Sequence, residues 1–100
     1  INPNQPNILN NLGNYYLERG NPQKSIKYLD KAISLNSENF SALYNKGRAL
    51  TTINKIDDAL DSLLVAISIE PDLLLAISSD TEFENIKNTE RFQKFLNIPL

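Results

Sequence analysis

The fold is decided by a stretch that occurs twice, as residues 9–35, LNNLGNYYLERGNPQKSIKYLDKAISL, and as residues 43–69, LYNKGRALTTINKIDDALDSLLVAISI. A shift of 34 residues superimposes the two copies, and the positions that match are mostly apolar or small. The identical pairs are Leu9 and Leu43, Asn11 and Asn45, Gly13 and Gly47, Leu29 and Leu63, Ala32 and Ala66, Ile33 and Ile67, and Ser34 and Ser68. A regular period of this length indicates a chain built from repeated structural units.

Each copy reads as two helices joined by a short turn. Leu9, Leu12 and Tyr16 follow helical spacing in the first half of the copy, and a second helical pattern follows the turn. The turn is Gly20-Asn21-Pro22, in which Gly20 can end one helix in the left-handed conformation while Asn21 and Pro22 begin the next. Asn54 aligns with Gly20 and tolerates the same conformation. Gly13 and Gly47 fall in mid-helix, which predicts close approach of a neighbouring helix.

This pattern resembles the tetratricopeptide repeat. The run Asn11-Leu12-Gly13-Asn14-Tyr15-Tyr16, with Ser25 and Ala32, is similar to the family's large, small and aromatic positions, and Asn45-Lys46-Gly47, Ala59, Ala66 and Pro71 repeat it. The sequence departs from the family at Lys46, where leucine is preferred, and at Ser37, where proline is common. The resemblance implies an all-α fold, an α-solenoid of antiparallel helix pairs, with repeats at residues 6–39 and 40–73.

The two ends are interpreted from the same register. Ile1 lies one period before Leu35, so residues 1–5 are expected to be the tail of an upstream repeat in a longer protein. Residues 74–100 are expected to form a degenerate third repeat and a helical C-terminal cap, because Asp80 and Thr81 replace leucine and glycine. Thr81 and Asn88 are the expected helix caps there. The expected plugs of the open core are Phe83, Ile86, Phe92, Phe95 and Leu96.

The composition excludes several classes of function. Hydrophobic residues make up 41% of the chain, and 10 basic and 12 acidic residues leave a net charge of −2, which favours neither a nucleic-acid nor a membrane partner. Cysteine and histidine are absent, so disulfides and the commonest metal ligands and general bases are missing. We therefore expect no enzyme, no metal and no cofactor. Asp57 and Asp58 are expected in the first turn of a helix, where negative charge is favourable. The expected location is cytoplasmic, but a chain beginning at Ile1 gives no targeting signal to interpret.

The resemblance also implies a binding face, because the first helices of successive repeats in this family line a groove that holds extended peptides. The residues assigned to partner binding are Asn10, Asn11, Asn14, Tyr44, Asn45 and Arg48. An asparagine side chain both donates and accepts, so it can hold a peptide backbone. Tyr44 and Arg48, one helical turn apart, offer an aromatic and a cationic anchor. The family's carboxylate clamp carries over only at Asn14 and Asn45, because Asn10, Leu75 and Ser79 stand at its basic positions.

The predicted function is a protein-interaction scaffold that binds another protein or peptide in this groove. The alternative is a structural spacer or homo-oligomerisation module, in which the open repeat edge or the apolar cap pairs with another copy. A third reading is an accessory domain of an enzyme. The asparagines also have a plain interpretation, since the chain is rich in them throughout. The aromatic residues Tyr15, Tyr16, Tyr28 and Phe40 are expected in core or inter-repeat packing rather than in base stacking.

Overall fold

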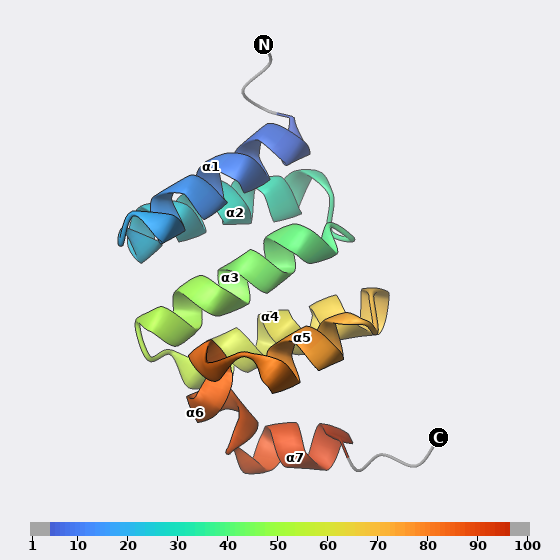
Figure 1. Ribbon diagram of the computed structural model, residues 1–100. Helices are drawn as coiled ribbons and strands as arrows, with labels where there is room; N and C mark the ends of the chain where they lie inside the picture. The colour runs from blue at the N-terminus through green and yellow to red at the C-terminus, as the bar shows by residue number, and fades with distance from the viewer. Residues whose placement is uncertain (1–4, 97–100) are drawn as a thin grey trace.

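The computed structural model describes residues 5–96, and every regular element in that range is helical (Figure 1). Two helix pairs come first, α1 (Pro6–Glu18) with α2 (Pro22–Leu35) and α3 (Phe40–Thr52) with α4 (Ile56–Ile69). A shorter C-terminal part follows, with α5 (Leu73–Ser79), the 3-10 turn η1 (Thr81–Phe83), α6 (Glu84–Lys87) and α7 (Glu90–Leu96). The pairs stack into a body of 45 × 27 × 19 Å, with α1, α3 and α5 in one layer and α2 and α4 in the layer behind. The predicted all-α solenoid is therefore confirmed.

The turns within the two pairs are built by the residues that the sequence singles out. Gly20 has a φ of 76° and Asn54 a φ of 62°, so both end a helix in the left-handed region as predicted. After Gly20, the backbone N–H of Asn21 donates to the carbonyl of Tyr16 at 2.9 Å, and the Asn21 side chain accepts from the N–H of Lys24 at 3.2 Å. Each chain reversal is thus fixed locally, before any contact between repeats.

The two mid-helix glycines make room for a leucine from the partner helix of the same pair. A Cβ placed on Gly13 would lie 2.4 Å from Cδ2 of Leu29, and one placed on Gly47 would lie 2.4 Å from Cδ2 of Leu63. Both leucines are fully buried. The predicted close approach is confirmed, and it is a leucine side chain that uses the space in both repeats.

The core is continuous across the second pair and the C-terminal part. Its buried members are Leu50, Ala59, Leu60, Leu63, Ile67, Ile77, Phe83, Ile86 and Phe92. Phe83, Ile86 and Phe92 close the end of this core, as predicted. Phe95 is only partly buried against it, and Leu96 is 41% exposed, so the prediction that Leu96 plugs the core is wrong.

The caps of the C-terminal helices differ from the predicted ones by one residue each. Asp80 rather than Thr81 caps η1, because its carboxylate accepts from the N–H of Glu82 at 2.9 Å. Thr89 rather than Asn88 caps α7, because its hydroxyl oxygen accepts from the N–H of Phe92 at 3.1 Å. In both places two good capping residues are adjacent, and burial of the phenylalanines selects the register.

The four aromatic residues assigned to packing divide into two groups. Tyr16 and Tyr28 stack with their ring centroids 5.5 Å apart, across α1 and α2, as expected. Tyr15 is 46% exposed, with the Arg19 guanidinium 3.7 Å from its ring centroid, and Phe40 is 37% exposed. The packing prediction is therefore wrong for these two, which are exposed.

Asp57 and Asp58 lie in the first turn of α4, as predicted. Between residues 5 and 96, no helix is long and apolar enough to cross a membrane. Ile1 to Asn4, and with them most of the expected upstream tail, lie outside the described residues, as do residues 97–100 of the cap.

Candidate partner-binding face

The six residues assigned to partner binding lie on α1 and α3, which pack against each other in the front layer of Figure 1. We call the surface formed by Asn10, Asn11, Asn14, Tyr44, Asn45 and Arg48 the α1–α3 face. Because equivalent positions of the two repeats differ by 34 residues, Asn10 is paired with Tyr44, Asn11 with Asn45, and Asn14 with Arg48. The repeat therefore presents the same side of each first helix at this surface.

Asn10 and Asn45 join the two helices through their side-chain amides. The Asn45 Nδ2 donates to the Asn10 Oδ1 at 2.9 Å, and the Asn10 Nδ2 donates to the Ser41 Oγ at 3.0 Å. Asn45 is only 8% exposed. Its amide is thus used inside the protein, where it positions neighbouring groups rather than facing solvent.

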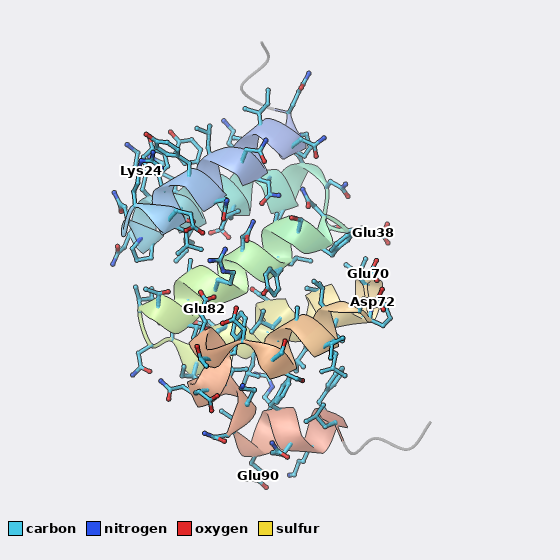
Figure 2. The ribbon with its side chains drawn as sticks, in the orientation of Figure 1. Lys24, Glu38, Glu70, Asp72, Glu82 and Glu90 are labelled. Atoms are coloured by element: carbon cyan, nitrogen blue, oxygen red, sulfur yellow. The ribbon has the colours of Figure 1, made fainter. Side chains whose placement is uncertain are left out.

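Arg48 is the centre of the face. Its Nη1 donates to the Oδ1 of Asn14 at 3.2 Å and to the Oδ1 of Asn45 at 3.3 Å. Its Nη2 donates to Glu18 at 3.2 Å, and its Nε donates to both carboxylate oxygens of Glu82 at 3.2 and 3.3 Å. Figure 2 shows Glu82 beside α3. One guanidinium thereby links α1, α3 and the 3-10 turn.

The surroundings of Arg48 keep it charged. Partial burial works to lower the pKa of Arg48, but the charges of Glu82 and Glu18 and their hydrogen bonds outweigh burial, so the pKa is raised. With two carboxylates around one guanidinium, the cluster has a formal charge of −1. The face is thus polar and nearly balanced in charge.

Tyr44 lies between this cluster and the C-terminal core. Its ring packs against Phe83 with the centroids 5.8 Å apart. Burial raises the pKa of Tyr44, Arg48 lowers it, and Asp80 and Glu82 raise it further, with a net rise. Tyr44 is thus an anchor for the turn η1 as well as a wall of the face.

Asn11 and Asn14 are the two members of the α1–α3 face that are exposed to solvent. Asn14 uses its Oδ1 to accept from Arg48, and its two N–H donors make no hydrogen bond to any described residue. Asn11 makes no side-chain hydrogen bond within residues 5–96. The structure therefore brings Asn10, Asn14, Asn45 and Arg48 into one network, whereas Asn11 stands beside it.

Sequence reasoning missed the two carboxylates of this face, Glu18 and Glu82. A signal for Glu82 exists, because Asn14, Arg48 and Glu82 occupy the same position in successive periods of 34 residues. Glu18 has no such signal, since Thr52 stands one period later. The pairing of Glu18 with Arg48 depends on how closely α1 and α3 approach each other.

Within the part of the chain that the structure describes, no group of three or more acidic side chains is placed to hold a metal ion. The tight pair Asp57 and Asp58 belongs to the start of α4, a helix that contributes no residue to the α1–α3 face. What the face offers chemically is hydrogen bonding: free amides at Asn11 and Asn14 beside a fixed, charged network.

These features define a helical repeat protein with a polar face on its first helices. Comparison with known families gives two matches to the tetratricopeptide repeat, at residues 6–39 and at residues 40–73. The chain belongs to the tetratricopeptide repeat family. None of the curated proteins compared with the sequence matches it. Repeats of this family are in general protein–protein interaction modules and are typically not catalytic.

Proposed function

We propose that this chain is a protein-interaction scaffold whose α1–α3 face holds an extended segment of a partner protein. The observation that carries the proposal is the placement of the exposed amides of Asn11 and Asn14, one helical turn apart, directly beside the Arg48 network. Both amides can pair with the N–H and C=O of an extended backbone. The binding would therefore depend little on the partner's side chains at these two positions.

Preorganisation supports the proposal. Asn10, Asn45 and Arg48 are held by hydrogen bonds between α1 and α3, so they do not have to be ordered when a partner arrives. Side chains that are fixed in advance reduce the entropic cost of association. The entropic cost that remains is that of ordering the Asn11 side chain and the NH₂ group of Asn14.

The charge of the face indicates the kind of segment it suits. Arg48 is already neutralised by Glu18 and Glu82, so a further carboxylate would compete with two internal ones. A neutral or weakly basic segment does not have to compete with Glu18 and Glu82 for Arg48. Its charge is also compatible with the formal charge of −1 that the cluster carries. Binding should consequently change little with salt concentration.

The test is selection from a library of unstructured peptides, followed by calorimetry on the best binder. Asn11→Ala and Asn14→Ala should each weaken binding by roughly two- to tenfold, the effect of one net hydrogen bond. Asn85→Ala is the matched control, because Asn85 is an exposed asparagine on α6, a helix that contributes no residue to the α1–α3 face. Binders that respond equally to all three substitutions, or to none, would show that the α1–α3 face is not the binding surface.

Self-association is a second candidate function, and exposed apolar side chains favour it. Leu75 on α5 is 76% exposed and Leu35 at the end of α2 is 51% exposed. Sedimentation velocity at several protein concentrations would test it. A species that grows with concentration and returns to a monomer in Leu75→Ser supports self-association, and a monomer at every concentration removes it.

A further inference from the structure

A pocket opens on the side of the molecule away from α1, between α2, α3 and α4. Its apolar lining is Ile26 of α2 and Leu50 of α3. Its polar lining is Asp30, Lys46, Asp58, Asp61 and Ser62. The volume is about 280 Å³, which is just below the range of about 300–1,000 Å³ that is usual for pockets of drug-sized ligands. The space therefore suits a single side chain rather than a cofactor.

The charges of the pocket are unevenly satisfied. Asp30 is paired with Lys46 at 2.6 Å, and Asp61 is paired with Arg91 of α7. Asp58 has no ion pair within residues 5–96. Lys46 itself stands where the repeat pattern has a leucine, as Leu12 shows in the first repeat, so it adds a charged side chain to a lining that already holds three aspartates and Ser62.

Ser62 gives an independent sign that the pocket can receive a hydrogen-bond donor. The residue is only 7% exposed and lines the pocket. Ser34 and Ser68, on α2 and α4, donate to a carbonyl of their own helix, at 2.7 and 2.6 Å. The Ser62 hydroxyl has no hydrogen bond to any described residue. Unlike the Ser25 oxygen, which is the fully enclosed, unpartnered side-chain oxygen within residues 5–96, the Ser62 oxygen faces the open pocket and is available to a donor that enters it.

We propose that this pocket binds the cationic head of a lysine or arginine side chain from a partner protein. The aliphatic stem would lie along Ile26 and Leu50, and the head would donate to Asp58, Asp61 and the Ser62 hydroxyl oxygen. An anion would meet Asp58, whose charge has no ion-pair partner within residues 5–96, and a purely apolar group would leave Ser62 without a hydrogen bond. This site is on a different side from the α1–α3 face and does not depend on its role.

The experiment uses the whole chain, labelled with nitrogen-15, and follows amide shifts during titration with n-butylammonium or N-ethylguanidinium chloride. These probes represent the two side chains separately, and n-pentanol is the neutral probe, with sodium chloride matching the ionic strength. Shifts should concentrate at Leu50, Asp58 and Ser62, and the stronger probe identifies the preferred side chain. Pentanol shifting the same amides to the same extent would overturn the proposal.

Three substitutions give results of different sign. Asp58→Asn should weaken binding about two- to fivefold, the scale of one partly exposed ion pair. Asp57→Asn is the matched control, because Asp57 is also in the first turn of α4 but does not line the pocket. Arg91→Ala frees Asp61 and should strengthen binding by a similar factor. Equal effects of Asp57→Asn and Asp58→Asn, or weaker binding in Arg91→Ala, would show non-specific attraction to an acidic surface and refute the site.

Discussion

Replacing Gly47 by alanine tests the contact that determines how closely the helices of a repeat pack. The new Cβ would lie 2.4 Å from Cδ2 and 2.5 Å from Cγ of Leu63, whereas carbon atoms prefer about 3.5–4.0 Å. Leu63 is fully buried, so it cannot swing into solvent to relieve the overlap. We therefore expect α3 and α4 to be forced apart in Gly47→Ala.

The magnitude follows from two opposing terms. Overpacking a filled core costs about 1–3 kcal/mol, and the overlap with Cγ as well as Cδ2 places this case in the upper part of that range. Alanine regains about 1 kcal/mol over glycine in mid-helix. The net loss in the free energy of unfolding should be about 1–2 kcal/mol, or roughly 4–16 °C in Tm for a domain of this size.

The assay is urea and thermal unfolding followed by circular dichroism, and a double-mutant cycle makes it decisive. In a Leu63→Ala background the overlapping atoms are gone, so the same Gly47→Ala change should become stabilising by about 1 kcal/mol. An osmolyte can keep the Leu63→Ala proteins folded during the measurement. Gly13 and Leu29 have the same distances and supply a replicate. A neutral or stabilising Gly47→Ala in the natural sequence, or no change of sign in the cycle, would refute the reasoning.

Three further predictions concern single side chains. Ser25→Ala should raise the free energy of unfolding by about 1 kcal/mol in urea melts, because the buried Ser25 hydroxyl has no hydrogen-bond partner within residues 5–96 and the equivalent Ala59 is equally buried. A lower free energy of unfolding in Ser25→Ala would contradict this. Thr89→Ala should lower the free energy of unfolding by about 1 kcal/mol while Asn88→Ala has little effect, because Thr89 is the cap of α7. Equal losses of stability in the two variants would show that Thr89 alone is not the cap. Burial raises the pKa of Tyr44 above 10.0, so the folded state holds this proton more tightly than the unfolded chain does. The resulting contribution to the free energy of unfolding is complete below about pH 10 and is lost as the pH rises through the folded pKa. Tyr44→Phe should therefore remove this part of the loss of stability at alkaline pH, as measured by melts at a series of pH values.

The helix pairs were predictable because their signals are local or periodic. The three residues Gly20-Asn21-Pro22 end one helix and start the next. Gly13 and Gly47 indicate that another helix packs closely at their positions, although not which residue of it makes the contact. The partner of each glycine was not predictable from periodicity alone. Leu29 and Leu63 match each other one period apart, but so do Ala32 and Ala66, and only the packing shows which residue enters the gap.

The C-terminal part was harder to predict because adjacent residues compete for the same role. Asp80 and Thr81, and likewise Asn88 and Thr89, are all favourable caps, so local propensity does not separate them. The register in which Phe83 and Phe92 become buried decides between them. In the same way, the residue type of Asn45 predicts an exposed polar side chain. Only the contact between α1 and α3 shows that its amide donates a hydrogen bond to Asn10 inside the protein.

The column formed by Asn14, Arg48 and Glu82 shows how a repeat protein can keep its register after the repeat pattern fails. In the third period the packing leucine and glycine are replaced by Asp80 and Thr81, and the helix is interrupted at that point. Yet the next residue, Glu82, still reaches Arg48, which in turn reaches Asn14, so hydrogen bonds connect the three positions in order. The Arg48 and Glu82 side chains are 20% and 29% exposed, and a charge pair at that depth is screened less than one at the surface. Because a guanidinium donates in several directions at once, the single arginine Arg48 of α3 is sufficient to hold both α1 and the 3-10 turn η1. Its position, rather than its charge alone, connects the α1–α3 face of the two repeats with the 3-10 turn that follows them.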